Sequence, residues 1–223
     1  MLPTIKVQDE IICNCPDLKI GLIRGTVVNK VTPDELWGEI EAECSAIKAK
    51  YQLLEINQRP AIMATRKLYR ALGKDPGRYR VSSEAMCRRI IKGNGLYRLT
   101  SLVDLINLVS VKSGYPISCL DADKIAGDTL TLGVGKKDEE YSGIGRGQLN
   151  IEGLPVYRDA EGGIATPTSD SIRTEITLQT TTVQININGF GPEMPMDEAI
   201  DWTCLLLERY AAASGLETEI LTF

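Results

Sequence analysis

The chain has 223 residues and a net charge of −5, with 43% hydrophobic and 25% charged residues. These values are typical of a globular protein with one large domain or two small ones. No apolar run approaches the roughly 20 residues that a membrane span requires. The first residues also lack the basic and apolar regions of a signal peptide. We therefore expect a cytoplasmic protein with no membrane partner.

The composition excludes several kinds of catalytic and metal chemistry. The chain has no histidine, which excludes Ser-His-Asp and Cys-His catalysis and every histidine-ligated metal. Its six cysteines include one close pair, Cys13 and Cys15, but the spacings typical of zinc sites are missing. We expect buried, reduced thiols, no metal and no cofactor.

Strands are expected at residues 4–7 and 19–29, which are rich in β-branched residues. Thr32 and Glu35 then form a capping box before a helix that extends to about residue 54. The chain continues with helices at residues 61–72 and from a Ser82 or Ser83 cap to about residue 92.

The next expected helix, at residues 101–111, is apolar except for Ser101, Asp104 and Asn107. Their spacing of three places them on one narrow stripe. The stripe either hydrogen-bonds to a neighbouring element or forms a pocket wall.

From residue 115 the pattern becomes β-like, and residues 182–188 alternate. One face of this strand is apolar, and the other carries Thr182, Gln184, Asn186 and Asn188. Such a face suits hydrogen bonds to a small ligand or a base edge, but half-exposed strands also look like this. A final helix from about residue 195 and a strand at residues 219–223 complete the chain.

A basic segment stands out against the acidic remainder of the chain. Residues 66–89 contain eight basic and two acidic residues, a net charge of +6, so the other residues sum to −11. Arginine and lysine could neutralise RNA phosphates here, and Tyr69, Tyr79 and Tyr97 could stack on bases. Two alternatives are a solvated helix face and structural pairing of Arg70, Arg78 and Arg80 with the carboxylates of Glu84, Asp104 or Asp121.

Two further motifs favour a structural role. Asp121, Asp123 and Asp128 suggest a cation loop, but the glycine and glutamate of an EF-hand are out of register. The glycine-rich residues 143–147 lack the Lys-Ser/Thr pair of a P-loop. We expect a turn and a flexible hairpin, respectively.

Read in order, several short motifs resemble the B3/B4 domain of the bacterial phenylalanyl-tRNA synthetase β chain, and more closely the freestanding proteins built from that domain. The matching pieces are Tyr69-Arg70, Leu72-Gly73-Lys74-Asp75-Pro76, Arg78-Tyr79-Arg80, Ser82-Ser83-Glu84-Ala85, Arg88-Arg89, Leu102-Val103-Asp104, Asn107, Val109-Ser110, Pro116, Asp121, Asp123, Ile125, Gly127-Asp128 and Pro155-Val156-Tyr157-Arg158-Asp159. The resemblance covers about residues 60–190. It implies an α/β (α+β) fold of mixed sheets with flanking helices, in which residues 1–60 form an extension packed on a B3/B4-like domain at 61–223.

The resemblance implies a pocket that in the synthetase edits mischarged tRNA, a second sieve beyond binding. The synthetase pattern has a histidine at the position of Ser118 and a glutamate at the position of Asn186. With both replaced, hydrolysis is an alternative and a shaped pocket near these residues is the expectation.

We therefore predict an RNA-binding protein that takes the acceptor end of a tRNA. Alternatives are a hydrolase of mischarged aminoacyl-tRNA, which would not be a complete synthetase, and a module that binds amino acids or other small molecules. The predicted RNA-binding residues are Arg66, Arg70, Lys74, Arg78, Arg80, Arg88 and Arg89. The predicted pocket residues are Ser118, Asp121, Arg173 and Asn186.

Overall fold

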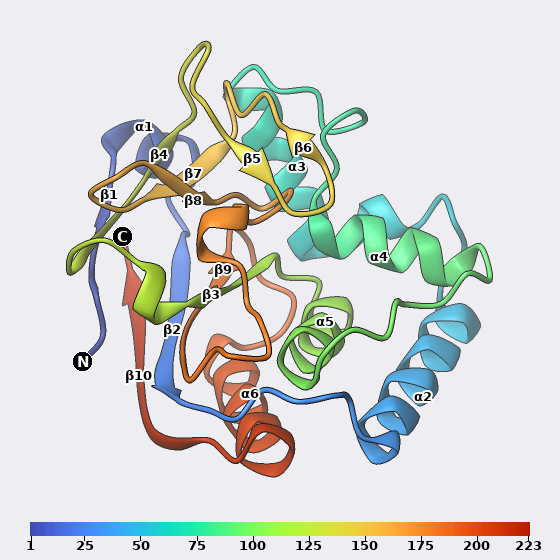
Figure 1. Cartoon of the computed structure of the whole chain (residues 1–223). Helices are drawn as coiled ribbons and strands as arrows, with labels where there is room; N and C mark the ends of the chain where they lie inside the picture. The colour runs from blue at the N-terminus through green and yellow to red at the C-terminus, as the bar shows by residue number, and fades with distance from the viewer.

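A computed structural model describes residues 1–223 and contains two four-stranded sheets with helices beside them (Figure 1). The strands are β1 (Thr4–Val7), β2 (Lys19–Thr26), β3 (Ile117–Asp121), β4 (Thr129–Val134), β5 (Ser142–Gly143), β6 (Gly147–Gln148), β7 (Pro155–Arg158), β8 (Gly163–Ala165), β9 (Thr182–Gly189) and β10 (Ser214–Thr222). The helices are α1 (Asp9–Asn14), α2 (Asp34–Lys50), α3 (Pro60–Ala71), α4 (Ser82–Ile91), α5 (Ser101–Ser113) and α6 (Met196–Ala211). None of these helices combines the length and the apolar character needed to cross a membrane.

The first sheet is mixed, as predicted, whereas the second is antiparallel throughout. The first sheet has the strand order β1-β4-β7-β8, and the second has the order β10-β2-β9-β3. Only β1 and β4 pair in parallel, and the other neighbours are antiparallel. Strand β2, from the first 60 residues, lies between β9 and β10.

The alternation of β9 separates two hydrophobic cores. Val183, Ile185 and Ile187 point into the larger core, which also holds apolar residues of α2, α4, α5 and α6. The smaller core lies between the two sheets, where Leu22 of β2 packs with Leu132 of β4. The molecule is therefore layered as helices, second sheet and first sheet.

The uncharged face of β9 is enclosed between the sheets. Gln184, Asn186 and Asn188 are each at most 1% exposed. The Tyr157 hydroxyl of β7 donates to the Asn188 side-chain oxygen at 2.6 Å. The half-exposed strand, one of the two alternatives for this face, is wrong, because the first sheet covers the face.

Most predicted helices and strands are confirmed to within a few residues, but the helix caps are not. Helix α2 begins after Pro33 without a side-chain cap, and the Thr32 hydroxyl donates instead to the Asp104 carboxylate. Helix α4 begins after Val81, also without a side-chain cap. The short helix α1 was not predicted, since six residues are too few to show a helical period.

Candidate nucleic-acid and ligand site

A polar hollow of about 290 Å³ opens beside the basic segment. Helices α4 and α5, strand β3, the β5–β6 hairpin and the loop after β8 all contribute to its wall. The lining residues are Ser82, Ala85, Met86, Ile106, Asn107, Ser110, Ile117, Ile144, Arg146, Thr166, Thr168, Ser169 and Asp170. The hollow thus combines an apolar wall, several hydroxyl groups, one guanidinium group and one carboxylate.

Asp170 is the only acid that lines the hollow. Burial raises the pKa of its carboxyl group to about 7, although hydrogen bonds from the Cys119 backbone N–H and from Ser118 act in the opposite direction. The Cys119 N–H donates to the carboxylate at 3.2 Å, and no ion pair neutralises Asp170. A carboxyl group with a pKa near neutrality can exchange protons at physiological pH.

The hydroxyl-rich part of the wall is held by a tight local turn. The Thr166 hydroxyl accepts from the backbone N–H groups of Thr168 and Ser169 and donates to the Ser169 carbonyl oxygen. The hydroxyl groups of Thr168 and Tyr69 lie 2.9 Å apart, which joins this turn to α3. The turn therefore presents its polar groups from a fixed position.

Arg146 reaches the hollow from the turn of the β5–β6 hairpin. Its flanking residues Gly145 and Gly147 have φ values of +67° and +64°, a backbone conformation that favours glycine. The Arg146 side chain has no ion-pair or hydrogen-bond partner among the protein side chains. Its guanidinium group is therefore available to an anionic ligand.

The polar stripe of α5 serves both of its predicted purposes. The Ser101 hydroxyl donates to the Asn29 side-chain oxygen at 3.2 Å, and Asp104 accepts from Thr32 and from the Leu99 backbone N–H. One turn further on, Asn107 lines the hollow. The stripe thus holds α5 against its neighbours and contributes to the pocket wall.

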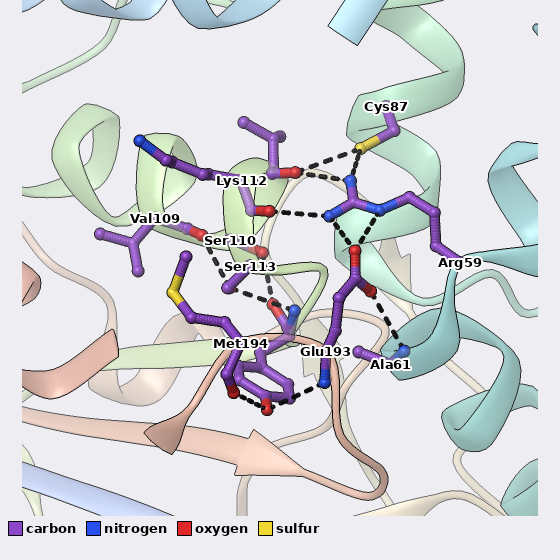
Figure 2. A network of polar contacts seen from close by, with 11 residues as sticks. Arg59, Ala61, Cys87, Val109, Ser110, Lys112, Ser113, Glu193 and Met194 are labelled. Atoms are coloured by element: carbon purple, nitrogen blue, oxygen red, sulfur yellow. Dashed lines mark hydrogen bonds and ion pairs between the residues drawn. The ribbon is translucent and has the colours of Figure 1, made fainter. Parts of the chain in front are cut away.

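The buried guanidinium group of Arg59 fixes the end of α5 (Figure 2). It donates to the carbonyl oxygens of Val111 and Lys112 at 2.6 and 2.8 Å. Glu193 pairs with it at 2.6 Å and accepts from the Ala61 backbone N–H at the start of α3. We call these two residues the Arg59–Glu193 clip, since they join α3, α5 and the loop after β9.

Several residues of the predicted RNA-binding set have internal partners. Arg66 pairs with the buried Glu84 at 2.8 Å, and Arg88 lies 3.7 Å from the same carboxylate. Lys74 is buried and donates to the Asn150 carbonyl oxygen. Arg89 stacks on the Tyr97 ring at 3.9 Å. These side chains stabilise the fold, but they are not the arginines of the structural alternative, which named Arg70, Arg78 and Arg80.

The remaining residues of the predicted set are exposed. Arg70, Arg78 and Arg80 face solvent, as does the neighbouring Lys67, and none of them is in an ion pair. The Arg66 guanidinium group donates to the Pro76 carbonyl oxygen, which holds the loop before Arg78 against α3. Arg78 and Arg80 therefore lie on the loop that leads into α4, and Arg80 is two residues before Ser82, which lines the hollow.

The predicted pocket residues lie behind and beside the hollow. Ser118 and Asn186 are register partners on β3 and β9 and are 2% and 0% exposed. Ser118 contacts Asp170 from behind. Asp121 accepts from Thr180 and caps a short turn.

Arg173 is held away from the hollow by an ion pair with Asp159 at 2.6 Å. The structure thus brings Ser118 and Asn186 together, but none of the four predicted pocket residues is on the wall of the hollow.

Sequence reasoning missed Asp170, Arg146 and the turn at Thr166. Asp170 follows a Thr-Pro-Thr-Ser segment that has the composition of an ordinary loop. Its enclosure depends on β3, which is fifty residues away in the sequence. Asn107 and the glycine-rich hairpin carried a sequence signal, and Ser82, Ala85 and Ser110 belong to the motifs that carry the family resemblance.

Comparisons with known proteins agree with the motifs. Residues 64–200 match the family model of the B3/4 domain, a range that contains every residue lining the hollow. Among solved structures, the chain is similar to an N-terminal fragment of the phenylalanyl-tRNA synthetase beta subunit from Pyrococcus horikoshii, with 15% identity and a TM-score of 0.47. The similarity covers 97% of this chain and 50% of that one, so this chain spans about half the length of the fragment. A comparison with curated proteins gave no match.

Proposed function

Since the chain belongs to the B3/4 domain family, as its motifs predict, we propose that it binds RNA and takes the acceptor end of a tRNA into the polar hollow. Arg70, Arg78 and Arg80 would hold the phosphates. Arg146 would contact the phosphate or ester group that enters the hollow. The apolar wall of α4 and α5 would take a side chain or a base.

The observation that carries this proposal is the group of exposed, unpaired cations next to a polar hollow. The chain as a whole is acidic, so these cations are not part of a general positive charge. A cytoplasmic location suits the same proposal, because all six cysteines are free thiols.

The test is binding to unfractionated tRNA over a series of salt concentrations. The Arg78→Ala/Arg80→Ala variant should bind more weakly, and its slope of log K against log salt should be shallower by about 1.5, because two phosphate contacts are lost. A tRNA that lacks its terminal adenosine should also bind more weakly if the hollow receives that end.

Arg98→Ala/Arg209→Ala is the matched control. It removes the same net charge from two partly exposed arginines elsewhere on the molecule. Equal effects of the two double variants, or binding that does not depend on salt, would contradict the proposal.

The raised pKa of Asp170 favours hydrolysis of a mischarged aminoacyl-tRNA as a second candidate function. In this reaction water attacks the ester carbonyl carbon, and the Asp170 carboxylate takes the proton from the water. The tRNA 3′-terminal hydroxyl leaves with a proton. General-base catalysis of this kind contributes about 10²–10⁴-fold.

A panel of mischarged tRNAs tests this second function. The wild-type protein should deacylate at least one of them above the buffer rate, and Asp170→Asn should lose that activity while it retains tRNA binding. Buffer rates for the whole panel would exclude hydrolysis and leave the binding proposal intact.

A further inference from the structure

A second surface lies at the opposite end of α3 from the exposed cations. Hollows of about 350 and 700 Å³ share Lys112, Met194, Pro195 and Glu198, so they form one groove. Its sides are the last turns of α2 and the first turns of α6, and its floor is the end of α5. We call this surface the α2–α6 groove.

The two side walls present matched helix faces. On α2, Glu43, Ala46, Ile47 and Lys50 line the groove, with a spacing of three and four residues. On α6, Glu198, Asp201, Trp202 and Leu205 follow the same spacing. In a helix this spacing places each set on one face.

Contacts between α2 and α6 close the groove at one end. Near the start of α2, Glu39 accepts from Arg209 and Tyr210 of α6 at 2.7 and 2.6 Å. Towards the other end, the Arg59–Glu193 clip and Met194 lie between the two helices. The α6 residues that line the groove extend from Asp197 to Leu205, about 12 Å or two helical turns.

The groove has an apolar interior and an acidic rim. Tyr51, Val111, Met194, Trp202 and Leu205 contribute apolar surface, and Leu205 is 58% exposed. The rim carries Glu43, Asp197, Glu198 and Asp201 against two lysines, Lys50 and Lys112. None of the three α6 carboxylates is in an ion pair.

Lys112 shows which chemistry the groove accepts. Its ammonium group lies 4.5 Å from the centre of the Trp202 ring and 4.0 Å from the Glu43 carboxylate. The Lys112 ammonium group thus makes a cation–π contact with the Trp202 ring and an ion pair with one carboxylate of the rim. The carboxylates of α6 offer the same contacts to a partner.

We infer that the α2–α6 groove binds a short amphipathic helix of a protein partner, with lysine or arginine beside apolar residues. Apolar side chains one turn apart would pack on Trp202 and Leu205, and flanking cations would pair with Asp201 and Glu198. RNA does not suit this surface, because the rim would repel its phosphates. A second copy of the chain is a poorer occupant, since its exposed cations lie on a different surface and the contact would be head-to-tail, whereas most homodimers use the same surface on both subunits.

The chain offers a direct optical test of this inference. It has only two tryptophans, Trp37 and Trp202, so Trp37→Phe leaves Trp202 as the single reporter inside the groove. The probe is a synthetic amphipathic peptide of leucine and lysine, two to three turns long. Its binding should change the Trp202 emission saturably, and a leucine–glutamate peptide of the same pattern should cause no change.

A charge reversal distinguishes the groove from general attraction to an acidic protein. Glu198→Lys/Asp201→Lys should weaken binding of the leucine–lysine peptide about tenfold or more, because two attractive contacts become repulsive. Asp128→Lys/Glu152→Lys makes the same change of net charge at exposed positions outside the groove and should have little effect.

Three outcomes would overturn the inference. The first is that the peptide causes no saturable change in Trp202 emission. The second is that the two double variants weaken peptide binding equally. The third is that the protein alone self-associates in sedimentation and that Glu198→Lys/Asp201→Lys abolishes this association. The last outcome would identify a second copy as the occupant.

Discussion

The Arg59–Glu193 clip is the residue pair on which the packing of α3 and α5 depends most directly (Figure 2). The Arg59 side chain is 3% exposed and the Glu193 side chain 15% exposed. Removal of one partner from such a pair leaves a buried charge without compensation, which costs about 3–5 kcal/mol. Glu193→Gln should therefore lower the free energy of unfolding, measured in urea, by about that amount.

The double variant and an exposed pair provide the controls for this prediction. Arg59→Met/Glu193→Leu should recover part of the loss, since no charge remains buried. Arg209→Met breaks an exposed pair with Glu39 and should cost only about 0–1 kcal/mol. A loss at Glu193 as small as that at Arg209 would show that the clip does not stabilise the packing of the two helices.

Asp170 should make the stability of the protein depend on pH. Burial raises the pKa of its carboxyl group from 3.8 to about 7 in the folded state, so the folded protein holds a proton that the unfolded chain releases near pH 4. The free energy of unfolding should therefore fall as the pH rises from about 4 to about 7. Above pH 7 this contribution should become constant.

Asp170→Asn isolates this effect. The variant cannot ionise at this position, so the difference in unfolding free energy between wild type and variant should change between pH 4 and pH 7 and level off above. The variant should gain relative stability at the higher pH. A difference that is constant with pH would show that the Asp170 carboxyl group titrates normally in the folded protein.

Single residues were predictable only where their partners are local in sequence. The Asp75-Pro76-Gly77 turn forms, with the Gly77 N–H donating to the Asp75 carboxylate, because its partners are two residues apart. Thr32 and Asp104 meet across seventy-two residues. That contact replaces the predicted Thr32 cap of α2, and no local sequence pattern predicts it.

At the scale of elements, periodicity predicted most of the helices and strands, but not what covers them. The alternation of β9 was correct, yet its polar face proved to be buried under the first sheet. A strand with one polar face is usually exposed on that face. The layer that covers it is formed by short, irregular strands such as β7 and β8, which carry little periodic signal.

Two glycines with opposite surroundings test how tightly these elements pack. A Cβ at Gly135, which follows β4, would lie 1.9 Å from the Ile151 carbonyl oxygen, whereas a Cβ at Gly38 in α2 would meet nothing within 4 Å. Gly135→Ala should therefore destabilise the protein by about 1–3 kcal/mol or more. Gly38→Ala should stabilise it by about 0.5–1 kcal/mol, because alanine favours a helix interior. Thermal unfolding should show shifts of opposite sign, and an unchanged Gly135→Ala midpoint would contradict the close packing at this connection.

At the scale of the whole molecule, charge of opposite sign is placed at the two ends of α3. Arg59, just before the helix, lines the α2–α6 groove with its acidic rim. Arg70, in the last turn, belongs to the exposed cations. Eleven residues separate the two, a rise of about 16 Å. This distance exceeds the Debye length of about 8 Å at physiological salt, so charge at one end is largely screened from the other.

This separation predicts that the two proposed ligands bind independently. The affinity of the leucine–lysine peptide, measured from Trp202 emission in Trp37→Phe protein, should be the same with and without saturating tRNA at physiological salt. Because thermodynamic linkage is reciprocal, the affinity for tRNA should also be unchanged when the peptide is present at saturation. At low salt the Debye length grows to about 30 Å, so a modest mutual strengthening should appear there, because the anionic tRNA and the cationic peptide attract each other. The contrary result would be competition between the two ligands at physiological salt that the Arg78→Ala/Arg80→Ala variant relieves. It would mean that the peptide also occupies the cationic surface, so that the two ends of α3 are not separate sites.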